Sequence, residues 1–153
     1  MRIQNSFYIV PVFIFTLFSG SLHAENLHDP AEYIGADIKT IYETWGIPDE
    51  LASMRGEKYE WDTVVFYKDG CSLFFVQNVV WQLRYDSSFN GEWNGITIGT
   101  LYPVIDSILG RAVVMPDGSR IYSLTGYSLP IQVRCYFEND KLTDVYIYRS
   151  NGL

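Results

Sequence analysis

The chain has 153 residues, of which 48% are hydrophobic and 16% aromatic, and this composition excludes an intrinsically disordered segment. Its 18 acidic and 11 basic side chains give a net charge of −7, which excludes the clustered positive charge that nucleic acids and anionic membrane surfaces require. The length fits one ordinary domain or two very small ones.

The first 24 residues have the layout of a secretory signal peptide. Arg2 precedes an apolar run from Phe7 to Phe18, and small residues then lead to Ala24. The run is about twelve residues long, whereas a helix needs roughly twenty to cross a bilayer. We therefore predict cleavage after Ala24, a periplasmic or secreted protein, and no membrane span after cleavage. An uncleaved membrane anchor is the alternative.

Residues 34–46, IGADIKTIYETWG, predict an amphipathic helix that ends at Gly46. Its apolar stripe consists of Ile34, Ile38, Ile41 and Trp45. Strand-like sequence follows over 60–70, 71–78 and 79–86, with turn signals at 68–70 and at Gln77–Asn78. We expect these elements to form one α+β unit over residues 25–85.

Residues 86–97, DSSFNGEWNGIT, form the predicted linker between two units. Their Gly, Asn and Asp residues indicate irregular backbone. Phe89 and Trp93 are too apolar to remain in water, so we expect the linker to be compact.

Residues 98–110, IGTLYPVIDSILG, match the first helix without a gap when Gly35 is aligned with Gly99. The expected stripe is Leu101, Ile105, Ile108 and Leu109, with Pro103 in the first turn and Gly110 as the stop. Strand-like sequence again follows, with a turn at Asn139–Asp140. The predicted fold class is therefore α+β. It consists of two tandem copies, 25–85 and 98–153, of a helix followed by an antiparallel three- to four-stranded meander, with the helices packed on one face of the sheet. Chance similarity between two amphipathic helices is the alternative.

A glycine before the helix, a Gly-x-Pro at its end and a strand meander make up a recognisable pattern. The chain carries it at Gly35, Gly46, Pro48, Gly99 and Gly110, whereas Ala112 stands where the second proline would be. The pattern resembles the small exported domains of the beta-lactamase-inhibitory-protein-like superfamily, which includes the SmpA/OmlA outer-membrane assembly lipoproteins. This resemblance implies a protein-binding module, in one case an enzyme inhibitor. The lipoprotein cysteine is absent here, so no lipid anchor is implied.

Catalytic side chains are scarce in the mature sequence. His28 is its only histidine, so a Ser–His–acid or Cys–His pair would depend on the chain terminus. His28, Asp29 and Glu32 do not have the spacing of a closed metal site, and no glycine loop ends in Gly-Lys-Ser/Thr. We therefore expect no enzyme, no metal and no cofactor. The alternatives are a small secreted hydrolase using carboxylates such as Glu57, Glu60 and Asp62, or a carrier of an apolar ligand between helices and sheet.

Cys71 and Cys135 are the only cysteines, and both fall on predicted core-facing strand positions. Export would permit a disulfide between them. Because they occupy corresponding places in two separate units, we expect two free thiols, with a single disulfide as the alternative.

Period-two alternation divides each strand into a core face and an outward face. In the strand over 79–86 it places Trp81, Leu83 and Tyr85 inside and Val80 outside. The outward face mixes Tyr, Phe and Arg, which is typical of protein-binding hot spots, although aromatic residues also favour strands in general. The predicted partner-binding residues are Phe74, Arg84, Arg134, Tyr136, Tyr146 and Tyr148. The expected partner is another envelope or secreted protein that offers basic or apolar groups.

Overall fold

The structure is a computed structural model that describes residues 29–55, 61–67 and 70–150. The predicted signal peptide, the turn residues Lys68 and Asp69, and the carboxylates Glu57 and Glu60 lie outside these ranges. The elements in chain order are a 3-10 helix η1 (Pro30–Tyr33), α1 (Ile38–Trp45), β1 (Glu50–Arg55), β2 (Trp61–Phe66), β3 (Cys71–Val76), β4 (Val79–Tyr85), α2 (Tyr102–Leu109), β5 (Val113–Val114), β6 (Arg120–Leu124), β7 (Ile131–Glu138) and β8 (Lys141–Arg149).

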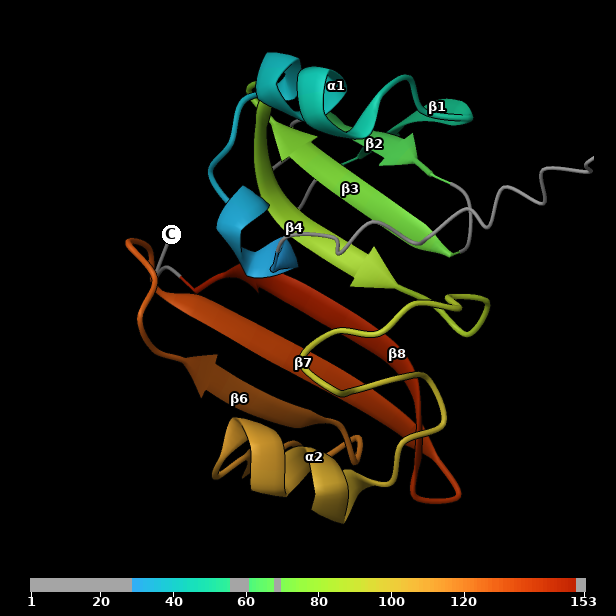
Figure 1. Cartoon of the computed structure of the whole chain (residues 1–153), viewed down its shortest axis with the longest axis vertical. Coiled ribbons are helices and arrows are strands. Elements are labelled where there is room, and N and C mark those ends of the chain that lie inside the picture. Colours follow the sequence, from blue (N-terminus) through green and yellow to red (C-terminus); the bar gives the residue numbers. More distant parts are fainter. Residues whose placement is uncertain (1–28, 56–60, 68–69, 151–153) are drawn as a thin grey trace, which may run out of the picture.

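All eight strands belong to one antiparallel sheet in the order β1-β2-β3-β4-β8-β7-β6-β5 (Figure 1). The central junction is the pairing of β4 with β8, in which Leu83 lies opposite Ile147. The predicted fold class, two tandem copies of a helix and a strand meander, is therefore wrong. The sequence patterns report local elements, whereas the junction depends on the free edge of β4 finding the free edge of β8, and no local pattern encodes that pairing.

Both α-helices end where the sequence predicts, at Gly46 and Gly110, but each begins four residues later than the predicted stretch, at Ile38 and Tyr102. The Asp37 carboxylate accepts a hydrogen bond of 2.8 Å from the backbone N–H of Thr40 and so caps α1. Gly46 and Gly110 end the helices with φ of 83° and 86°, which confirms the expected positive φ. Their ψ values of −164° and −155° place both in a region that only glycine populates readily.

Two β-bulges interrupt the strand alternation. The first shifts the β3–β4 register between Phe74 and Phe75, so that Phe74 pairs with Gln82 and Phe75 with Val80. Trp81 is the extra residue, and the predicted inside–outside assignment is therefore wrong at this point: Val80 is buried in the core and Trp81 contacts Phe74 on the opposite face.

The second bulge shifts the β7–β8 register between Tyr136 and Phe137 and makes Thr143 the extra residue. Beyond each bulge, the strand that follows the turn pairs with the backbone just before a helix. Val80 exchanges hydrogen bonds with Gly35 and Ala36, and Leu142 exchanges them with Gly99 and Thr100. The backbone just before each helix is therefore hydrogen-bonded to the sheet beside a bulge.

One continuous core lies on the face of the sheet that carries the helices. It includes Ile41 of α1, Ile105 of α2 and the strand residues Leu73, Leu83, Val133 and Ile147, all of them fully buried. The predicted linker is compact, as expected, because Phe89 and Trp93 are buried in the same core and Phe89 stacks on Tyr85 with ring centroids 3.8 Å apart. In Figure 1, η1 and this loop cross the sheet between α1 and α2.

Asp29 fastens the beginning of the described chain to this core. Its carboxylate accepts hydrogen bonds from the Trp93 indole N–H, at 3.1 Å, and from the Tyr127 hydroxyl. These bonds join η1, the linker and the loop before β7 at one point. Among the described residues, no helix is long and apolar enough to cross a membrane.

Candidate protein-binding surface

The strand registers define an open face, which is the sheet face opposite the core. Arg84 on β4 lies opposite Tyr146 on β8, and Tyr146 lies opposite Arg134 on β7. In the next row Phe74 lies opposite Gln82, and Gln82 lies opposite Tyr148. The described helices and the linker bury their side chains in the core on the other side of the sheet.

The structure places all the predicted partner-binding residues on this open face, and all of them are partly buried. They are not equally close together. Arg84, Arg134, Tyr136 and Tyr146 form one connected group, whereas Phe74 lies two strands away from Tyr146. Tyr148 hydrogen-bonds through its hydroxyl to the side-chain oxygen of Gln132 at 3.2 Å.

Arg84 is held by a carboxylate of its own chain. Its Nε and Nη2 atoms donate to the two oxygens of Asp144, at 2.9 and 2.5 Å. This bidentate hydrogen bonding raises the pKa of Arg84, so the guanidinium stays charged at any physiological pH. The same guanidinium lies 5.4 Å from the ring centre of Tyr146.

Arg134 is also held by hydrogen bonds from its own chain, in this case to two residues of a loop. Its Nη2 donates to Asp117 at 2.7 Å and its Nε donates to the hydroxyl of Ser119 at 2.9 Å. Asp117 and Ser119 belong to the loop between β5 and β6. The Arg134 guanidinium lies 5.0 Å from the ring centre of Tyr136, which in turn meets Tyr146 edge to face at 5.7 Å.

These ion pairs determine what the open face offers to a partner. Each arginine is balanced by one aspartate, so the connected group carries no net charge, and each guanidinium already uses its Nε and Nη2 atoms as donors within the chain. Burial raises the pKa values of Tyr146 and Tyr148, so both phenols remain neutral at physiological pH. The face therefore presents aromatic rings and neutral hydroxyls rather than free charge.

Sequence reasoning missed three residues of this surface. Trp81 packs against Phe74 at 6.4 Å, and only the bulge turns it to this side. Asp144 alternates to the outward face together with Tyr146 and Tyr148, but its pairing with Arg84 depends on the β4–β8 junction. Asp117 lies in the turn sequence MPDGS, where an Asp followed two residues later by Ser signals a side-chain-capped turn.

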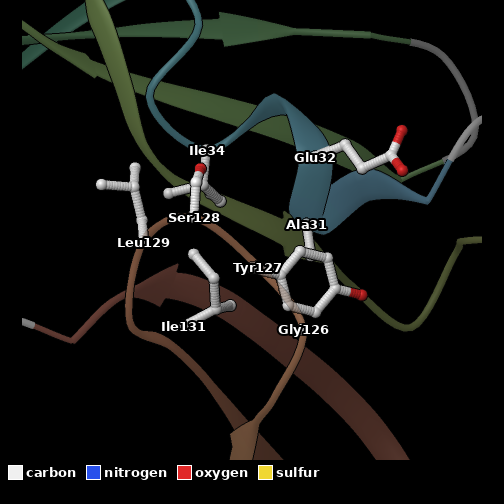
Figure 2. A pocket seen from close by; sticks show the side chains of 8 residues that line it. All are labelled: Ala31, Glu32, Ile34, Gly126, Tyr127, Ser128, Leu129 and Ile131. Atoms are coloured by element: carbon white, nitrogen blue, oxygen red, sulfur yellow. The ribbon is translucent and has the colours of Figure 1, made fainter.

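A small pocket lies elsewhere, between η1 and the loop before β7 (Figure 2). Its volume is about 280 Å³, and in Figure 2 the side chains of Ser128, Leu129 and Ile131 lie on one side and that of Tyr127 on the other. Ala31 and Ile34 contribute the η1 wall. The volume is at the lower limit for a small-molecule site, and the described residues contain no group of three or more His, Cys, Asp or Glu side chains that could hold a metal.

No protein-family model and no curated protein sequence matches the chain. Solved structures share its fold, among them the following two. One is an extracellular protein containing an SCP domain from Bacillus anthracis str. Ames, which is 13% identical, has a TM-score of 0.56, and is matched over 86% of this chain and 49% of that one. The other is a cysteine-rich secretory protein from Staphylococcus aureus subsp. aureus Mu50, which is 12% identical, has a TM-score of 0.53, and is matched over 81% of this chain and 46% of that one.

The chain thus spans about half the length of each of these proteins, and at such identities the likeness concerns the fold alone. Neither match supports the predicted tandem repeat. The resemblance to the beta-lactamase-inhibitory-protein-like superfamily is not addressed by these matches and stays a prediction.

Proposed function

We propose that the chain is an exported, noncatalytic protein-binding module of the cell envelope or medium, inhibitor-like or assembly-factor-like, that binds its partner through the open face. The observation that carries the proposal is the group of partly buried aromatic rings on that face, held in place by Arg84–Asp144 and Arg134–Asp117. Rings with few rotatable bonds, already fixed before binding, lose little entropy when a partner covers them.

Export is supported by two independent observations. The N-terminal segment has the composition of a signal peptide, and the two structural neighbours are described as extracellular and secretory. A protein in such a location can act on other envelope or secreted proteins without chemistry of its own. The pocket of Figure 2 would suit the alternative of an apolar-ligand carrier, but its small volume makes it the weaker candidate.

The test compares the wild-type chain with the variant Tyr136→Ala/Tyr146→Ala as bait in envelope and medium extracts, followed by affinity measurement on each purified captured protein. We expect each substitution to weaken the affinity for a true partner by about 2 kcal/mol, or roughly 30-fold, because both rings belong to the centre of the surface. Tyr42→Ala, a partly buried tyrosine on α1, is the matched control and should leave the affinity unchanged.

Thermal unfolding of the same variants separates binding from folding. The double variant should stay folded, because both rings are partly exposed and lie outside the core. A partner that binds the wild type and the folded double variant equally well would contradict the proposal.

A further inference from the structure

We infer that the outer edge of β1 is a second binding surface, and that its occupant is an extended segment of a partner protein, which adds a ninth strand to the eight-stranded sheet. This surface is separate from the open face, so the inference does not rest on the proposed function. Two observations carry it: a backbone edge with unused hydrogen-bonding groups, and a row of core side chains that ends uncovered at this edge.

The outer edge of β1 offers backbone groups to an incoming strand. β1 is six residues long and is the last strand of the sheet beyond β2 (Figure 1). Antiparallel pairing directs the N–H and C=O groups of alternate residues to opposite edges, so about three of its residues point these groups away from β2. None of the described residues outside β2 forms a backbone hydrogen bond with β1. The chemistry that matches such an edge is another extended backbone.

A row of core side chains crosses the sheet from β6 to β1 and ends uncovered. Each member lies opposite the next in the strand registers, and every member except the last has no exposed surface. The row consists of Tyr122, Val133, Ile147, Leu83, Leu73, Val65 and Leu51. At the β6 end α2 closes the row, because the Tyr122 hydroxyl donates to Asp106 at 2.8 Å. At the β1 end Leu51 is 59% exposed, so an apolar side chain from an added strand would complete the row.

The row also specifies the sequence of the segment that fits. Directly opposed residues of neighbouring strands project to the same face, so the residue opposite Leu51 should be apolar and β-branched. Alternate residues of the segment then face the core side, and those between them face the other side, where polar residues are tolerated. Ile47, in the connection from α1 into β1, is 91% exposed and is a second uncovered apolar side chain beside this strand in the sequence.

A second copy of β1 fits this edge less well than a segment with its own sequence. Two copies that pair antiparallel with their core faces on the same side can place Leu51 opposite Ser53 or Arg55, which sets a polar or charged residue against the end of the row. Placing Leu51 opposite Leu51 keeps the apolar match, but it then pairs only Glu50 to Ala52 of β1. The occupant is therefore a segment of another protein.

The test uses the purified exported chain and a fluorescent synthetic peptide in which valine alternates with threonine. We expect fluorescence anisotropy to show saturable binding, and hydrogen exchange at the outward amides of β1 to slow in the complex. A peptide of the same composition with its valines in one block should bind about tenfold more weakly, because only alternation puts every valine on the core face.

Leu51→Thr tests the end of the row, and Met54→Thr is the matched control. Met54 is a half-exposed apolar residue of the same strand, but it projects to the opposite face. Leu51→Thr should weaken peptide binding about tenfold, whereas Met54→Thr should leave it nearly unchanged. Both variants should stay folded in thermal unfolding, because both side chains are at least half exposed.

Failure of the alternating peptide to bind the wild type overturns the inference, and so does equal binding to the wild type and to folded Leu51→Thr. A dimer in sedimentation equilibrium that depends on Leu51, without peptide binding, also overturns it, because the occupant is then a second copy. These measurements leave Tyr136 and Tyr146 unchanged, so a negative result would not bear on the proposed function of the open face.

Discussion

Cys71 and Cys135 lie on different strands of the single sheet, and the strand order determines whether they can form a disulfide. Both are buried, and in the registers Cys71 lies opposite Tyr85, Tyr85 opposite Val145, and Val145 opposite Cys135. The two cysteines are therefore three strand spacings apart, roughly 14 Å, whereas a disulfide needs Cα atoms within about 7 Å. Both cysteines are free thiols, as expected.

The first prediction is that denaturation without reductant exposes two reactive thiols per chain, while the folded chain at pH 8 reacts slowly. Burial raises the pKa of both thiols to about 12, so the reactive thiolate is rare in the folded state. Reaction with an aromatic disulfide reagent measures the number of reactive thiols in guanidinium and the rate of their reaction in the folded chain. Zero thiols in the denatured chain would show that the strand registers are wrong.

The same burial gives stability a pH dependence. A thiol in the unfolded chain ionises near its ordinary pKa of 9.0, whereas Cys71 and Cys135 in the folded chain hold their protons until about 12. The folded state therefore binds more protons between these values, and the free energy of unfolding falls as the pH rises through that window. Replacing both cysteines by alanine should flatten this fall in urea titrations at pH 8 and pH 10.

At the scale of elements, the helix ends depend on backbone geometry. We expect Gly46→Ala or Gly110→Ala to lower the free energy of unfolding by roughly 1–3 kcal/mol, because both glycines combine positive φ with extended ψ. The loss should come from backbone strain alone, since an added Cβ would meet nothing within 4 Å at either site. Chemical denaturation measures the change.

Asn139→Gly is the control for this element-scale prediction. Asn139 has a φ of 50° in a two-residue hairpin turn, a conformation that glycine accepts, so its replacement should leave stability nearly unchanged. Alanine variants of Gly46 and Gly110 that are as stable as the wild type would mean that the helices end in another conformation.

Elements with local signals could be predicted from the sequence, and those that depend on distant partners could not. Gly46, Gly110 and the turn at Gln77–Asn78 were found because the positive φ that each requires restricts the residue type. Trp81 was assigned to the wrong face because a strict period of two does not allow for a bulge. The open face was predicted correctly over β7 and β8, where its residues alternate without interruption up to Tyr136.

At the scale of the whole molecule, the β4–β8 junction makes folding one event. Leu83 and Ile147 are both fully buried in the shared core. Neither half of the sheet can therefore complete its packing alone. We expect Leu83→Ala to lower the free energy of unfolding by about 2–5 kcal/mol and to do so for the entire sheet. Hydrogen exchange in β7 should rise as much as exchange in β3.

This cooperativity can be tested by comparing denaturation curves from two spectroscopic probes. All four tryptophans lie between residues 45 and 93, so their fluorescence reports the first half of the chain, whereas far-ultraviolet circular dichroism reports every strand. The two denaturation curves should superimpose in the wild type and in Leu83→Ala. Val113→Ala, on the exposed edge strand β5, should barely shift either curve. Two separated transitions would argue for independently folding halves.

The two outermost strands differ in length, so an additional strand can pair with one edge of the sheet more readily than with the other. β5 is two residues long and gives an incoming strand almost no backbone to pair with, whereas β1 extends over six residues and exposes Leu51 and Met54. A stray extended segment can therefore be templated at β1 and not at β5. Misassembly of this protein would therefore begin at β1, and the substitution Leu51→Lys would oppose it by placing a charge on that edge.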